Sequence, residues 1–270
     1  QIFHHLGEFT GAADRLARNV NANNIDTVVR QQSLYTLTSA RVLLGWHDGL
    51  DDQIGRLLKE ARSHGNVEAV AWCIMAQGLA HLVSRKYTIA LRRFQAAYAA
   101  AAACGQRSLR GESLLLQGLA LVLDNRVREA HACYQILAQS SEGHGLIDRQ
   151  VMASVLAQCC LCHLSEHQHL GAEIDRLAAL QVAASDQASS WIHLLKVWFH
   201  HHHDRTDQAK KSMEQALNLG LSSDWNLGLA FVLATLMQQN SIHKPMLEQA
   251  YGRFEQFLPH ACFLSSEAVA

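Results

Sequence analysis

Residues Gln117 to Ala138 read QGLALVLDNRVREAHACYQILA, and this stretch decides the fold. Gly118 is small enough to let a second backbone approach closely. Ala130 follows twelve residues later as a second small contact, and Tyr134 comes one helical turn after it as a large plug. The polar pair DN between the two halves favours a turn. The spacing therefore predicts two antiparallel helices packed as a tight hairpin.

The same pattern resembles the tetratricopeptide repeat, which carries a small residue midway along its first helix and an Ala, aromatic, Ala series along its second. Equivalent pairs four residues apart recur along the chain: Ala12 with Leu16, Ile54 with Leu58, Ala90 with Phe94, Ala130 with Tyr134, Ala172 with Arg176, Ala209 with Met213, and Ala250 with Phe254. Their mean spacing is about 40 residues, longer than the roughly 34 of a standard unit. The resemblance implies a degenerate repeat with longer helices or loops.

Composition agrees with an all-helical chain. The sequence holds 2 prolines, and apolar residues recur at intervals of three and four with no sustained strand-like alternation. We therefore expect an all-α, right-handed superhelical solenoid of about six antiparallel helix pairs after a leading helix. No linker composition divides these pairs, which predicts a single domain over residues 1–264 and a tail at 265–270. The last predicted pair spans residues 225–258.

Charge and cysteine content restrict the partners. A formal net charge of -1 lacks the concentrated Lys and Arg of a nucleic-acid footprint and disfavours adsorption to a membrane. The 7 cysteines lie mostly in apolar helical runs, which suits a reducing compartment. We expect an intracellular protein, cytoplasmic or nuclear, that binds neither nucleic acid nor membrane directly. Because the chain opens at Gln1 in the middle of periodic sequence, we also expect a piece of a longer protein.

The strongest candidate for a metal or redox site is the cluster Cys159, Cys160, Cys162 and His163. Zinc sites and redox motifs need a second ligand pair or a strand-to-helix context, which the sequence lacks. Small side chains in a helix interface explain these cysteines without chemistry. The run from His200 to His203 also fits a polar turn better than a metal site. We therefore predict no metal and no cofactor.

No catalytic motif occurs in the chain. A Gly-x-Ser-x-Gly elbow, a His-Glu-x-x-His zinc motif, a P-loop and a dinucleotide fingerprint are all missing, so we expect no enzyme. The remaining class of function is recognition of a partner at the protein surface. In tetratricopeptide arrays the first helix of each pair lines the concave side, and the phase of Gly118 identifies the positions expected there. These groove residues are Trp72, Met75, Leu79 and Leu82, then Glu112, Leu115, Leu119 and Val122, then Trp191, Leu194, Trp198 and His201.

Two interpretations of the large side chains stay open. Trp72, Trp191, Trp198 and Trp225 fit binding anchors and fit core packing equally by position. Arg30, Arg41, Arg107 and Arg110 either hold an acidic partner or are solvated surface groups. The groove lacks the repeated Lys, Asn and Arg set that clamps a peptide carboxylate, which disfavours a pocket for a chain terminus.

The stretches AQGLAHLVSRKYTIALRRFQAAYAAAAACG and LQGLALVLDNRVREAHACYQILAQS are similar to the helical-repeat arrays of maltose-regulator and LuxR-type bacterial transcription regulators. Degenerate repeats of this kind also occur in eukaryotic scaffolds such as the cohesin-loader partner and cell-cycle ligase subunits. The resemblance implies a non-enzymatic scaffold that binds a protein or peptide partner, including other domains of the same parent protein. The alternative it implies is a small-molecule-sensing domain of a multidomain transcription regulator.

Overall fold

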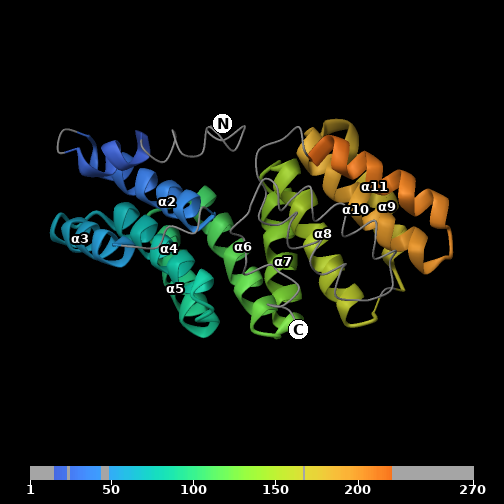
Figure 1. Cartoon of the computed structure of the whole chain (residues 1–270), viewed down its shortest axis with the longest axis horizontal. Helices are drawn as coiled ribbons and strands as arrows, with labels where there is room; N and C mark the ends of the chain where they lie inside the picture. The colour runs from blue at the N-terminus through green and yellow to red at the C-terminus, as the bar shows by residue number, and fades with distance from the viewer. Residues whose placement is uncertain (1–14, 23–24, 44–48, 167, 221–270) are drawn as a thin grey trace. The chain divides into compact units, whose positions relative to one another are not determined.

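The structure is a computed structural model, and it describes residues 15–22, 25–43, 49–166 and 168–220. These residues form helices joined by short turns, with no strand among them (Figure 1), so the all-α prediction is confirmed. The helices are Thr27–Leu43 (α2), Leu50–Ser63 (α3), Val67–Val83 (α4), Tyr87–Ala103 (α5), Arg107–Leu123 (α6), Val127–Glu142 (α7), Ile147–His163 (α8), Leu170–Leu180 (α9), Asp186–His202 (α10) and Thr206–Gly220 (α11), with a 3-10 turn at Gln181–Ala183. Residues 15–21 are also helical.

Some of the expected features fall outside the described residues. The predictions that fall there are those for Ala12, Trp225, Cys262, the pair Ala250 with Phe254, the helix pair at 225–258 and the tail at 265–270.

One constant period organises the backbone. Four helices begin at equal intervals along the chain, namely α2 at Thr27, α4 at Val67, α6 at Arg107 and α8 at Ile147, and α10 begins at Asp186, one position short of the next interval. Each of these five helices is 17 residues long. The mean spacing expected from the sequence is confirmed by these starts. We call these five helices the first helices, and the helix that follows each of them a second helix.

The turns repeat with the same period. Left-handed residues close four first helices, at Arg85, Asn125, Ser165 and Asp204, and left-handed glycines close three second helices, at Gly65, Gly105 and Gly145. At the end of α4, the Arg85 N–H bonds the Leu82 carbonyl at 3.0 Å and the Lys86 N–H bonds the His81 carbonyl at 2.9 Å. This bond pair is a Schellman motif, which satisfies carbonyls that the helix end would leave unpaired.

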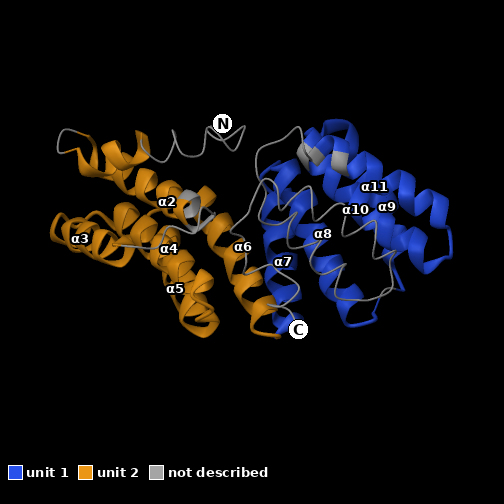
Figure 2. Ribbon diagram, in the orientation of Figure 1, with its two compact units in different colours: residues 1, 126–257, 264–270 blue, residues 2–125, 258–263 orange. Residues whose placement is uncertain are grey.

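The chain divides into two compact units, coloured orange (unit 2) and blue (unit 1) in Figure 2. The described residues up to Asn125 belong to unit 2, and those from Arg126 onward belong to unit 1. Each unit contains its own packed helices, described separately below. The single domain expected over residues 1–264 stays a prediction.

In unit 2, α4 packs against α2, α3 and α5, and α5 packs against α6. A close contact joins α4 to α5, where Phe94 covers Gly78 so closely that any side chain at Gly78 would meet the ring. Ala90 and Phe94 are both fully buried, as the repeat pattern predicts. Side-chain N-caps start two of the first helices, α2 and α4: the Asn66 side chain accepts a 3.0 Å bond from the Ala69 N–H, and the Asp26 carboxylate accepts a 2.8 Å bond from the Val28 N–H.

In unit 1, α8 packs against α7 and α10, and α10 packs against α11. The predicted pairs Ala130 with Tyr134 and Ala209 with Met213 are buried, as expected. The predicted pair Ala172 with Arg176 is wrong as a core pair, because both residues are exposed. The buried side of α9 is instead formed by Leu170, Ile174 and Leu177.

Candidate functional site

Side chains from three successive first helices of unit 2 meet around Tyr35. The ring of Tyr35 on α2 lies 5.2 Å from the ring of Trp72 on α4, centroid to centroid, with the planes tilted by 48°. The Tyr35 hydroxyl and Oε1 of Glu112 on α6 form a 2.8 Å hydrogen bond, which a carboxylate can only accept. All three side chains are partly exposed. We call Tyr35, Trp72 and Glu112 the aromatic–carboxylate cluster.

The repeat explains why these residues meet. Trp72 and Glu112 occupy the sixth position of α4 and of α6, so equal registers place them on equivalent faces of their helices. Tyr35 occupies the ninth position of α2, three residues beyond that register and therefore on the same face. The cluster thus joins three repeats through side chains that lie up to 77 positions apart in sequence.

The residues expected in the groove fall into two groups. Partly exposed are Trp72, Glu112, Leu115, Val122 and His201, whereas Met75, Leu79, Leu82, Leu119, Trp191, Leu194 and Trp198 are buried. A buried side chain contributes to packing and cannot touch a partner in this conformation. The contacts bring Trp72 and Glu112 into one cluster of unit 2, while Trp191, Trp198 and His201 lie on α10 of unit 1.

Sequence reasoning missed Tyr35. It lies one full repeat before Met75, which was expected in the groove, so one further step of the repeat would have found it. The phase marker was a small residue at Gly78 and Gly118, and α2 has Thr38 at that position instead. Thr38 fits there because it is fully buried and its hydroxyl donates a 2.8 Å bond to the Leu34 carbonyl.

The end of α10 in unit 1 is rich in aromatic and imidazole rings. Trp198 lies 4.2 Å from the ring of His202, and Phe199 lies 4.3 Å from the ring of His203. On the same helix, burial and then the nearby Lys196 charge lower the pKa of His193. Its Nε2 lies 3.3 Å from the Gln181 side-chain nitrogen, which places it as an acceptor from that amide. A neutral packing role fits His193.

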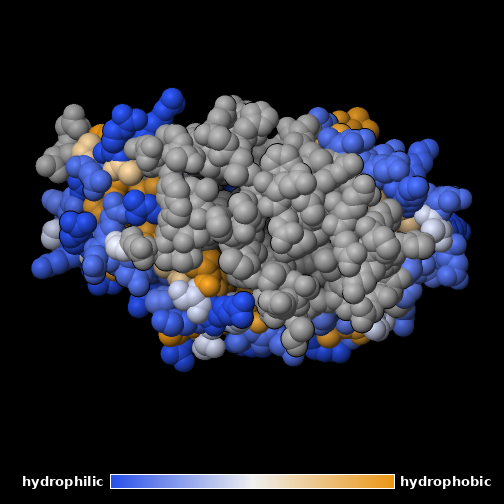
Figure 3. Space-filling view, viewed as in Figure 1, coloured by the Kyte–Doolittle hydropathy of each residue, from blue (hydrophilic) through white to orange (hydrophobic). Residues whose placement is uncertain are grey.

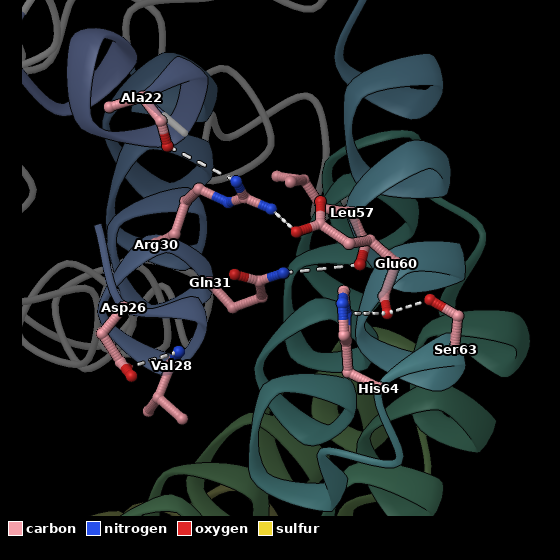
Figure 4. A network of polar contacts seen from close by, with 9 residues as sticks. All are labelled: Ala22, Asp26, Val28, Arg30, Gln31, Leu57, Glu60, Ser63 and His64. Atoms are coloured by element: carbon pink, nitrogen blue, oxygen red, sulfur yellow. Dashed lines mark hydrogen bonds and ion pairs between the residues drawn. The ribbon is translucent and has the colours of Figure 1, made fainter. Parts of the chain in front are cut away.

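A partly buried ion pair joins α2 to α3, as Figure 4 shows. The Arg30 guanidinium pairs with the Glu60 carboxylate and also donates a 3.4 Å bond to the Ala22 carbonyl. Beside it, the Gln31 side-chain nitrogen donates to the Leu57 carbonyl at 3.4 Å. Arg30 is 7% exposed, so it is neither a solvated surface group nor positioned to hold an acidic partner.

Two more of the predicted arginines contact neighbours of their own unit. Arg41 donates a 3.3 Å bond to the Gln53 side chain. Arg110 donates a 3.1 Å bond to the Tyr98 hydroxyl and lies 5.2 Å from the centre of that ring. Arg107 is exposed. Arg41 and Arg110 therefore contact side chains that lie outside the aromatic–carboxylate cluster.

A few buried polar atoms in the described residues have no hydrogen-bond partner. In unit 2 these include the indole Nε1 of Trp72, the side-chain oxygens of Gln31 and Gln77, and Nε of Arg30. An unpaired buried donor costs free energy, and native proteins keep few of them. The Trp72 nitrogen is notable because the same side chain belongs to the aromatic–carboxylate cluster.

The cysteine cluster lies inside α8. Cys159, Cys160 and Cys162 are buried and reduced. Burial raises the pKa of the Cys159 thiol to about 12, and burial followed by the neighbouring thiols raises the pKa values of Cys160 and Cys162 further. Thiols held protonated in this way are poor nucleophiles and poor metal ligands. Within the described residues, no group of three or more His, Cys, Asp or Glu side chains is placed to hold a metal ion.

Exposed large apolar side chains of the described residues are spread over several elements. The exposed large apolar residues of the described chain are Val29, Val67, Ile89, Ile136, Leu146 and Val182, which belong to different elements. On the face seen in Figure 3, the described surface is mostly hydrophilic with orange areas interspersed. Among the described helices, none combines the length and the apolar character that crossing a bilayer requires.

Two solved structures share this fold. A Rap protein complexed with competence and sporulation factor aligns over 96% of this chain and 71% of its own, with 11% sequence identity and a TM-score of 0.67. The apo form of the quorum sensor NprR from B. thuringiensis aligns over 96% of this chain and 79% of its own, with 12% identity and a TM-score of 0.55. No family model and no curated protein matches the sequence. At sequence identities this low, the similarity bears on the fold alone. The two structural matches confirm a tetratricopeptide-like helical repeat.

Proposed function

We propose that this chain is a non-enzymatic scaffold that binds an extended segment of a peptide or protein along the concave side of its first helices. The observation that carries the proposal is the aromatic–carboxylate cluster, in which partly exposed side chains of α2, α4 and α6 meet on equivalent helix faces. Aromatic side chains are enriched at the energetic centres of interfaces because they bury a large area with few rotatable bonds.

The shared fold supports the proposal independently. The Rap protein of the same fold was solved with competence and sporulation factor bound, and NprR is described as a quorum sensor. A helical-repeat fold supplies long rows of equivalent positions, which suit recognition of an extended chain better than they suit assembly of a catalytic site.

Selection from a random peptide library tests the proposal. The full chain is panned against phage-displayed dodecapeptides, and Trp72→Ala is panned in parallel. The matched control is Ile89→Ala, because Ile89 is an exposed apolar residue of the same unit on the second helix α5. We expect enrichment of related sequences with the unmodified chain and with Ile89→Ala, and its loss with Trp72→Ala. Equal enrichment by all three proteins would contradict the proposal that the first helices form the binding surface.

A second candidate is a small-molecule-sensing domain of a larger regulator. The description of NprR as a quorum sensor favours it, because sensing is the property named for a protein of this fold. A ligand that binds only the folded state raises the thermal midpoint of unfolding. This alternative would be supported if a metabolite raised the thermal midpoint and the same chain enriched no peptides. A metabolite panel that leaves the midpoint unchanged would count against it.

A further inference from the structure

The geometry points to a cationic side chain, lysine or arginine, as the group of the bound peptide that the aromatic–carboxylate cluster recognises. The inference rests on the proposed function and specifies its chemistry at one position. It follows from three properties of the cluster: its charge, its two aromatic rings and its unused hydrogen-bonding capacity.

The charge of this face is carried by Glu112. The inward register of the three first helices in unit 2 holds Gln32 and Tyr35, then Trp72, Met75, Leu79 and Leu82, then Glu112, Leu115, Leu119 and Val122. Among these ten positions only Glu112 is ionisable to a charged form near neutral pH. None of the ion pairs among the described residues includes Glu112. A carboxylate on an otherwise uncharged face attracts a cation from the ligand.

Two arginines of α2 and α6 are paired elsewhere. Arg30 on α2 pairs with Glu60, and Arg110 on α6 contacts Tyr98. Both are therefore committed to partners on other helices. The Glu112 carboxylate contacts a neutral donor instead, the Tyr35 hydroxyl at 2.8 Å. That bond occupies one acceptor site of Oε1, so Oε2 and the rest of the acceptor capacity remain for a ligand.

The two rings favour the same ligand. A cation is attracted to the face of tryptophan or tyrosine within about 6 Å of the ring centre. Trp72 and Tyr35 lie 5.2 Å apart, and Glu112 is bonded to the second of them, so one ammonium or guanidinium group can contact a ring and the carboxylate together.

Other side chains fit this cluster worse. An acidic residue would face the Glu112 charge at short range, which is unfavourable. An apolar residue would contact the rings but would remove water from the carboxylate without replacing its hydrogen bonds, and burying an unpaired charge is costly. A lysine or arginine offers both an alkyl stem for the rings and donors for the carboxylate.

The test pans the full chain against bead-displayed random hexapeptides and measures the enrichment of lysine and arginine at each position over the starting library. Glu112→Gln keeps the size and the Tyr35 contact but removes the charge. The matched control is Glu68→Gln, because Glu68 also bonds a neutral partner across helices, the Gln106 amide at 2.8 Å. We expect basic residues to be enriched at one position by the unmodified chain and by Glu68→Gln, and about tenfold less by Glu112→Gln.

A selected hexapeptide then localises the contact. Its basic residue is replaced by norleucine, and the dissociation constants of both peptides are measured with the unmodified chain and with Glu112→Gln. We expect the replacement to weaken binding by about tenfold in the first case and by less than about threefold in the second. Equal weakening in both proteins, or selected peptides without a basic preference, would overturn the cationic inference while leaving the proposed function standing. No enrichment of any sequence would instead overturn the proposed function, and this inference with it.

Discussion

The substitution Gly78→Ala adds one methyl group at the close contact between α4 and α5. A Cβ built at Gly78 on α4 lies 2.3 Å from Cε1 and 2.6 Å from Cδ1 of Phe94, whereas ordinary contact starts at 3.4 Å. The ring or the helix must therefore move by about 1 Å. Phe94 is 0% exposed, so the ring cannot swing into solvent to make room. Gly78→Ala should force α4 and α5 apart.

Two terms set the size of the effect. Overpacking a close-fitted core lowers the free energy of unfolding by about 1–3 kcal/mol. Replacing glycine by alanine inside a helix raises it by about 1 kcal/mol. The net expectation is that Gly78→Ala lowers the free energy of unfolding by up to about 2 kcal/mol. Gly55→Ala is the matched control, because Gly55 lies inside α3 with no atom within 4 Å of the added Cβ. That variant should be more stable by about 0.5–1 kcal/mol.

Urea unfolding followed by circular dichroism at 222 nm measures both variants, and amide hydrogen exchange shows whether the loss is concentrated in α4 and α5. Combining Gly78→Ala with Phe94→Leu should restore part of the stability, because the smaller side chain vacates the space that the methyl group needs. A double variant less stable than the sum of the single effects would contradict the contact. So would a Gly78→Ala chain as stable as Gly55→Ala, and either result would refute the packing described for this hairpin.

Three further sets of substitutions test the ion pair, the turns and the buried thiols. Glu60→Ala leaves the buried Arg30 guanidinium unpaired, and because Glu60 is 34% exposed the expected cost is about 2 kcal/mol, below that of a fully buried pair. Adding Arg30→Met should recover most of this cost in urea unfolding, and a loss under about 0.5 kcal/mol for Glu60→Ala would contradict the pairing. Arg85→Gly should stabilise by about 0.5–1 kcal/mol and Gly105→Ala should destabilise by about 1 kcal/mol, since both positions have φ near the left-handed value, 56° and 72°; midpoints that move in the same direction would contradict this. Burial raises the pKa of Cys159 from 9.0 to about 12, so the unfolded chain loses a proton that the native chain keeps, and stability should fall as pH rises from 9 towards 12. Between pH 8 and pH 10 the free energy of unfolding should fall by about 1 kcal/mol more for the unmodified chain than for Cys159→Ala. An equal fall in both chains would refute the burial of this thiol.

The repeat could be predicted from sequence because small and large side chains alternate where helices touch. Ala90 with Phe94 and Ala130 with Tyr134 are buried as expected, since each small residue faces a neighbouring helix and each aromatic ring fills the space beside it. The prediction failed at α9 because the sequence marker Ala172 lies 42 residues after Ala130, whereas the buried residues Leu170, Ile174 and Leu177 lie 40 residues after Ala130, Tyr134 and Leu137. Ala172 and Arg176 are therefore two positions away from the buried register and fall on the exposed side of the helix.

The candidate site could be predicted only in part. Helical register identified Trp72 and Glu112 as members of the same face, because that depends on position within one repeat. Which members of a face are buried depends on the neighbouring repeats, so the register alone could not separate Met75 and Leu79, which are buried, from Trp72. The contact with Tyr35 depends on a distance between repeats, and no local pattern encodes it.

The departures from the repeat matter more for recognition than the repeat itself. A perfectly regular array would present the same apolar residue at every inward position and would bind any apolar segment with little preference. At the sixth position of α4 and α6 this chain has Trp72 and then Glu112, and neither residue is needed to bury a neighbouring helix, since both remain partly exposed. Residues that break local regularity without improving the packing are expected at functional sites. Trp72 and Glu112 are therefore two positions whose substitution should change the choice of ligand and leave the helical repeat folded.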